Sequence, residues 1–106
     1  MTPLQVAMEA LDKQEKALEA IAKQTFQDLN TVAGSERLAK WKTATATLLK
    51  QLVGDRVANQ FSLAKPGPSF TNDLVEEFEG DVEVYRAALR TARKSVQAQV
   101  SAAPPA

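Results

Sequence analysis

The carboxylates best spaced for chemistry lie in the last third of the chain, where Glu76, Glu79 and Glu83 stand three and four residues apart. On a helix this spacing puts all three on one face, where they could hold a hard cation or act as a paired acid and base. The 106 residues include no histidine and no cysteine, the usual general bases, thiol nucleophiles and transition-metal ligands. Carboxylate metal sites in helical bundles draw on several helices and on histidines. We therefore interpret this row as a solvated acidic face and expect no catalytic, cofactor-binding or metal-binding residues and no enzyme activity.

A further acid, Glu15, interrupts an apolar row near the start of the chain. Leu4, Met8, Leu11 and Leu18 recur around it at alternating steps of three and four residues, the spacing of a helix seam that packs against a partner. A carboxylate within such a seam needs a basic partner from another helix, whereas one at its edge reaches water. Both interpretations stay open. These five residues are the possible interaction face.

Basic residues in the middle of the chain offer a different function. The candidates for contact with an anion or a nucleic acid are Arg37, Lys40, Lys42, Lys50 and Arg56. A base could stack on Trp41 beside them, although Trp41 and Tyr85 both fall on apolar stripes and are expected in the core. The 13 basic and 13 acidic residues cancel, so no overall field attracts nucleic acid or an anionic membrane. Nucleic-acid or nucleotide binding is therefore the alternative function.

The element that would carry the apolar row is a long first helix. Thr2 and Gln5 have the spacing of a capping box around a first-turn proline, which predicts a helix start. Gly34 supplies a stop, so this helix is expected over about 3–33. Beyond Leu18 the row should continue through Ala22, Leu29 and Val32.

Two shorter elements should follow. Ser35 is a good helix cap, so a second helix is expected over about 36–53, and the short turn before it makes the two helices antiparallel. A brief helical segment is expected near 55–61. The Pro-Gly-Pro sequence at 66–68 must then be a loop.

The last helix is expected over about 72–100. Thr71 or Asn72 would cap it, and Phe70 would act as a hydrophobic staple before it. Gly80 costs about 1 kcal/mol in a helix, so we expect it to allow close approach of another backbone or a bend.

Charge is separated along this last helix. Residues 73–83 carry six acids and no base, and residues 86–94 carry four bases and no acid. An acidic start and a basic continuation complement the dipole of a helix. We interpret the separation as structural, with an acidic or basic docking face as the alternative.

Length and composition fit one helical domain. Hydrophobic residues make up 44% of the chain and aromatic residues 6%, a mixture typical of packed helices, and 106 residues can bury a core without a disulfide or a metal. We expect an all-α bundle of three main helices within a single domain over 1–100, and a disordered tail or the start of a linker over 101–106. The absence of cysteine and of any long apolar stretch favours a cytoplasmic location without membrane contact.

One pattern within residues 38–90 is familiar. It comprises Trp41-Lys42, Thr45, Leu49, Gly54, Phe61, Phe70, Tyr85 and Leu89. It resembles a helical accessory module found N-terminal to effector or sensor domains in bacterial defence and nucleotide-sensing proteins, including proteins with TIR-like domains. The resemblance implies a mediating role, in which the module docks or oligomerises while the chemistry resides elsewhere.

The favoured function is a non-catalytic interaction or oligomerisation module that works through amphipathic helix faces. A first helix of about thirty residues would be about 45 Å long at 1.5 Å per residue. The shorter second helix could not cover all of its seam. We therefore expect the seam to meet the last helix or another chain, with a homodimer as the favoured assembly.

Overall fold

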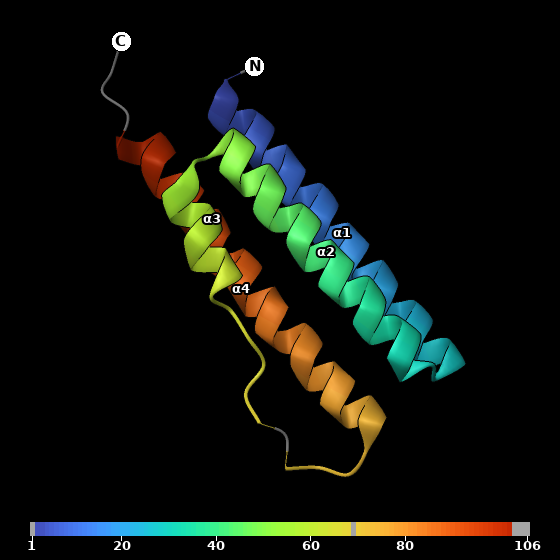
Figure 1. Ribbon diagram of the computed structural model, residues 1–106. Coiled ribbons are helices and arrows are strands. Elements are labelled where there is room, and N and C mark those ends of the chain that lie inside the picture. The colour runs from blue at the N-terminus through green and yellow to red at the C-terminus, as the bar shows by residue number, and fades with distance from the viewer. Residues whose placement is uncertain (1, 69, 103–106) are drawn as a thin grey trace.

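The computed structural model describes residues 2–68 and 70–102. Over these residues the chain forms four helices and no strand (Figure 1). The helices are α1 (Pro3–Asp28), α2 (Thr31–Leu52), α3 (Asp55–Ser62) and α4 (Leu74–Ala102). The all-α bundle predicted from the sequence is confirmed. None of the described helices is both long enough and apolar enough to span a membrane.

The first helix begins as predicted but ends earlier. The Thr2 hydroxyl accepts a hydrogen bond from the Gln5 backbone N–H at 3.2 Å, and the Gln5 side chain accepts one from the Thr2 N–H at 2.9 Å, which completes the capping box. At the other end Leu29 adopts the left-handed conformation, with φ of 58°. The Asn30 side chain then accepts a hydrogen bond from the Ala33 N–H at 3.1 Å. The turn therefore lies at residues 29–30.

We expected Gly34 to end the first helix. This prediction is wrong, because Gly34 lies inside α2. A Cβ atom at Gly34 would come within 2.5 Å of the Thr25 Oγ1 and 3.1 Å of the Phe78 ring. The glycine thus allows α1 and α2 to approach closely. This is the role that we expected of Gly80, where a Cβ would meet nothing within 4 Å.

The start of α4 also differs from the prediction. The Asp73 carboxylate accepts hydrogen bonds from the N–H groups of Val75 and Glu76 at 3.0 and 3.2 Å, so Asp73 caps the helix in place of Thr71 or Asn72. Phe70 is 98% exposed and makes no staple. Helix α4 extends to Ala102, and the rest of the predicted tail, 103–106, lies outside the described residues.

One core joins the four helices. Its largest fully buried apolar side chains include Leu18 of α1 and Phe78, Val82 and Val96 of α4. The Trp41 ring meets the rings of Phe61 and Tyr85 edge to face, with centroids 5.9 and 5.8 Å apart. The predicted core positions of Trp41 and Tyr85 are confirmed, which leaves neither ring face free for a stacked base.

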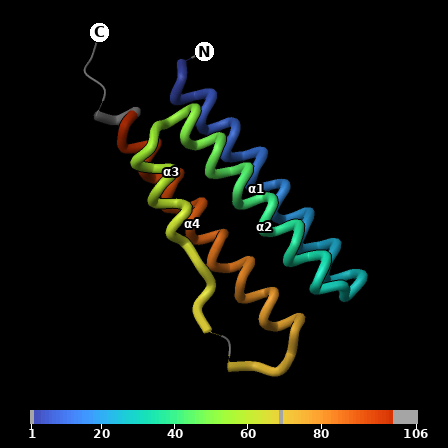
Figure 2. The backbone as a smooth tube through the Cα atoms, viewed as in Figure 1, coloured from blue at the N-terminus to red at the C-terminus, as the bar shows by residue number. Residues whose placement is uncertain are grey.

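Helices α1 and α4 run antiparallel over most of their length (Figure 2). The contacting pairs are Phe26 with Phe78, Glu19 with Arg86, and Asp12 with Arg93. In these pairs the residue number in α1 decreases as the residue number in α4 increases. The two helices therefore keep one antiparallel register along the bundle. The α1–α2 turn and the start of α4 therefore lie together at the end of the bundle opposite the N terminus (Figure 1).

Candidate interaction site

The predicted interaction face on α1 is largely taken up by the internal core. Leu11 and Leu18 are buried, and Leu4 and Met8 are partly buried against the same core. Glu15 lies at the edge of this face, exposed, with its Oε2 2.7 Å from Nη2 of Arg93. Both features expected for Glu15 are thus present, a basic partner from another helix and access to water. The seam is therefore occupied within a single chain.

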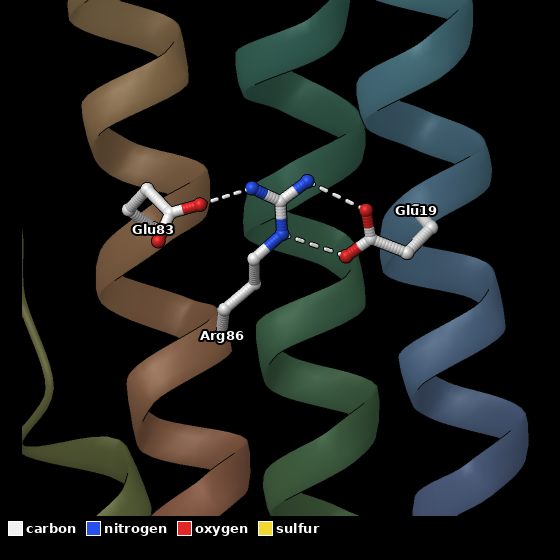
Figure 3. Close-up of polar contacts among 3 residues, drawn as sticks. All are labelled: Glu19, Glu83 and Arg86. Atoms are coloured by element: carbon white, nitrogen blue, oxygen red, sulfur yellow. Dashed lines mark hydrogen bonds and ion pairs between the residues drawn. The ribbon is translucent and has the colours of Figure 1, made fainter.

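Two arginines of α4 hold the exposed side of the α1–α4 contact. Figure 3 shows Arg86 between two glutamates: its Nε and Nη2 donate to Glu19 at 2.7 and 2.5 Å, and its Nη1 donates to Glu83. The hydrogen bonds from Arg86 lower the pKa of Glu19, and those to Glu19 are the main cause that raises the pKa of Arg86. Two helical turns further along α4, Arg93 binds Asp12 and Glu15, each at 2.7 Å. These contacts join α1 to α4.

The acidic row at the start of α4 is exposed and divided among separate contacts. Glu83 pairs with Arg86, the Glu76 carboxylate accepts a hydrogen bond from the Thr71 hydroxyl at 3.3 Å, and Glu79 faces solvent. Within the described residues, no three acids gather as a metal site would require.

The basic residues proposed for anion contact do not all lie on one face. Successive residues turn by about 100° around a helix, so Arg37, Lys42 and Lys50 point in three directions around α2. Lys42 is engaged: its Nζ donates to the Ala64 carbonyl at 2.7 Å and lies 5.4 Å from the centre of the Tyr85 ring. Burial, followed by the charge of Lys65, lowers the pKa of Lys42.

The basic candidates are also divided between two helices. Arg37 is half-buried, and Lys40, Lys50 and Arg56 are exposed. Arg56 belongs to α3, whereas the others belong to α2. The structure therefore brings these residues to no common groove.

Exposed apolar side chains gather instead where the α1–α2 turn meets the start of α4. Leu29 is 63% exposed, Val32 70% and Leu74 62%, and Phe26 beside them is 37% exposed. We call Phe26, Leu29, Val32 and Leu74 the apolar end. The predicted place of Leu29 and Val32 on the inner seam is wrong, because α1 ends before both residues.

A groove crosses the apolar end between the first turns of α2 and α4, with a volume of about 380 Å³. Its lining residues are Thr31, Val32, Ser35, Glu36, Leu74, Glu77, Phe78 and Asp81. Phe78 is buried and meets Phe26 edge to face, with ring centroids 5.9 Å apart. Val32 and Leu74 thus continue the core outward into solvent.

Every charged residue that lines this groove is acidic. Burial, followed by the charge of Glu77, raises the pKa of Asp81. Burial and then the charge of Asp81 raise the pKa of Tyr85, one turn further along α4. None of the ion pairs in the described part of the chain involves the carboxylates of this groove. Glu36, Glu77 and Asp81 make it both acidic and partly apolar.

A second groove, of about 310 Å³, lies between α3 and α4. Val57, Phe61 and Ala92 are among its lining residues, and Leu63, 78% exposed, stands at its edge. None of the described residues that line it is charged. The groove of the apolar end is thus distinguished by its acids.

Comparisons of the chain with family models, with curated proteins and with solved structures find no match.

Proposed function

We propose that this protein is a non-catalytic interaction module that docks a partner protein on its apolar end. The observation that carries the proposal is the exposure of Leu29, Val32 and Leu74 beside an acidic groove at one end of the bundle. Contiguous exposed apolar side chains on an otherwise polar surface are typical of protein contact sites. The proposal keeps the class of function predicted from the sequence and moves its surface from the α1 seam to the apolar end.

Burial of these side chains would give a useful free energy of association. Covering a leucine or valine fully contributes about 1.5–3 kcal/mol relative to exposure, and the three residues are each about two-thirds exposed. Several kcal/mol are thus available before the entropy cost of association is subtracted. A contact of this size suits a reversible partner.

Leu29 supports the proposal independently. A leucine in the left-handed conformation costs about 1–2 kcal/mol, and glycine or asparagine is the usual residue at such a helix end. Here the strained position holds a large apolar side chain that packs little against its own chain. Strain of this kind concentrates at functional sites.

Amide NMR with two synthetic peptides tests the proposal. Both peptides are amphipathic helices with leucine at positions i, i+3, i+4 and i+7, and they differ only in carrying lysine or glutamate on the flanks. We expect at least one to shift the amide signals around Val32 and Leu74. Leu74→Ser should weaken that binding, and Leu63→Ser, a matched change in the second groove, should not. If neither peptide perturbs the apolar end, the proposal fails.

The homodimer expected from the sequence is one form of the same function. Light scattering across the micromolar range tests it directly. A mass that rises toward that of a dimer and returns to that of a monomer in Leu74→Ser would place a second copy on the apolar end. The nucleotide-binding alternative has less support, because its basic residues are dispersed and the groove is acidic.

A further inference from the structure

The position of the groove, between two helices of the bundle, suits a third helix. Helix α3 has eight residues and packs beside α2 and α4 at the end of the bundle near the N terminus (Figure 1). The described residues 63–68 and 70–73 form no helix, so they do not continue α3 toward the apolar end. The groove lies there, between two helices that run along the long axis of the bundle. A segment laid along this groove would extend the position that α3 occupies at the other end.

The apolar residues of the groove match the contact stripe of an amphipathic helix. Val32 and Leu74 stand on opposite sides, one on α2 and one on α4, with Phe78 between α1 and the groove. Helices that dock in grooves insert apolar residues spaced at i, i+3, i+4 and i+7. Such a row would cover Val32 and Leu74 together.

The charges of the groove select the flanks of that helix. Glu36 stands on the α2 side, and Glu77 and Asp81 stand on the α4 side, so both rims are acidic. Residues 73–83 add further acids and no base. Complementary charge favours the encounter and sets the specificity of such a contact.

We infer that the groove binds a partner helix that is apolar on one face and carries lysine or arginine on both flanks. This inference rests on the proposed function and names the chemistry of the partner. A second copy of this chain fits less well, because a two-fold contact would place the acidic rims of the two copies against each other. A phosphate backbone would be repelled by the same carboxylates.

The experiment compares the affinities of the lysine-flanked and glutamate-flanked peptides by fluorescence anisotropy. We expect the lysine peptide to bind at least about tenfold more tightly at low salt, a difference of about 1.4 kcal/mol. Because exposed charges are screened, this preference should shrink as salt is added.

Two double variants assign the preference to the groove. Glu36→Gln with Glu77→Gln should remove most of the preference for lysine while the peptides still bind. The control, Glu9→Gln with Asp55→Asn, makes the same change in net charge at the opposite end of the bundle and should keep the preference. Circular dichroism of all variants checks that each remains helical.

Two results would overturn the inference. Equal affinity for the two peptides would leave the proposed function standing and show that charge does not select the partner. A dimer in wild type that is lost in Leu74→Ser would show that a second copy covers the groove. Failure of the proposed function is distinct, because then neither peptide shifts the apolar end.

Discussion

Two buried threonines in this core have the same side chain and opposite hydrogen-bond states. Thr25 and Thr45 are both 0% exposed. The Thr25 hydroxyl donates to the Ile21 carbonyl at 2.9 Å, whereas the Thr45 hydroxyl has no hydrogen-bond partner among the described residues. A buried polar group without a partner costs about 1–3 kcal/mol. Thr45 is thus a weak point of the core.

Valine has nearly the shape of threonine, so it removes the hydroxyl and keeps the packing. We expect Thr45→Val to raise the free energy of unfolding by about 1 kcal/mol. Thr25→Val is the control, since it removes a satisfied hydroxyl and should leave stability unchanged or lower it. Urea denaturation followed by circular dichroism measures both. Equal effects of the two changes would show that the Thr45 hydroxyl is satisfied in solution.

Asp81 predicts a pH dependence that follows from its raised pKa. Because the folded state holds this pKa above its ordinary value of 3.8, the charged carboxylate lowers stability at neutral pH. Asp81→Asn should therefore stabilise the protein near pH 7. The gain should begin to fade as the pH drops through the folded pKa, and it should vanish below the ordinary value of 3.8, where the carboxyl is neutral in both states. Thermal unfolding of both proteins from pH 7 to pH 3 checks this, and a gain that grows in acid would contradict it.

At the scale of elements, two glycines within helices have opposite surroundings. Gly34 lies where α2 crosses α1, and Gly80 lies on an exposed part of α4. Alanine is favoured over glycine in a helix by about 1 kcal/mol. At Gly34 that gain is opposed by contact of the new Cβ with Thr25, whose branched side chain is stiff.

We expect Gly80→Ala to stabilise the protein by about 1 kcal/mol. Gly34→Ala should destabilise it by about 1–3 kcal/mol, the usual cost of overpacking a core. Paired denaturation curves give the two differences in free energy. A Gly34→Ala variant as stable as wild type would mean that α1 and α2 can move apart enough to fit the new Cβ without a loss in the free energy of unfolding.

The turn between α1 and α2 carries a prediction about Leu29. Glycine adopts the left-handed conformation without strain, so Leu29→Gly should raise the free energy of unfolding by about 1 kcal/mol. It should also weaken peptide binding at the apolar end. The control is Leu63→Gly at the end of α3, where φ is −74° and glycine relieves no strain. If Leu29→Gly unfolds more easily than wild type, Leu29 contributes packing that outweighs its strain.

The sequence predicted the kinds of element better than their junctions. Apolar spacing and the Thr2 capping box identify α1 because both are local signals. The position of the first turn is not decided by local signals, because Gly34 and Asn30 are both residue types that occur at helix ends. The choice depends on whether another helix packs close to Gly34. The residue that does so, Thr25, is nine residues earlier in the chain, so local sequence does not reveal the contact. The local signal for the observed turn is Asn30, whose side chain caps α2 through the Ala33 N–H.

At the scale of the whole molecule, the contact surface could not be predicted from one helix alone. The α1 row was expected to need the last helix or another chain, and in the structure α2 and α4 of the same chain both pack against α1. The apolar end arises from the opposite cause: once the turn falls at Leu29, Val32 points outward at the start of α2. Leu74 joins it only because the chain returns to the same end. The acids of residues 73–83 were evident from the sequence, but their position beside exposed apolar residues was not.

The register of α4 on α1 is marked by ion pairs at two levels of the bundle, which gives a prediction for the molecule as a whole. Arg86 and Arg93 are each about one-quarter exposed in their side chains and bind carboxylates of α1. Exposed ion pairs contribute about 0–1 kcal/mol each. We expect Arg86→Met and Arg93→Met each to lower the free energy of unfolding by up to about 1 kcal/mol at low salt.

Salt and pH separate these ion pairs from simple packing. Added salt should narrow the difference between wild type and either methionine variant, because it screens the charges. Arg90→Met is the control, since in the described part of the chain Arg90 makes no ion pair, and its effect should not depend on salt. The lowered pKa of Glu19 means that its contribution is present above its ordinary value of 4.5 and is lost as the pH falls through the folded pKa. Arg86→Met should therefore lose less stability than wild type on acidification, and an equal loss would show that the helices hold their register by apolar packing alone.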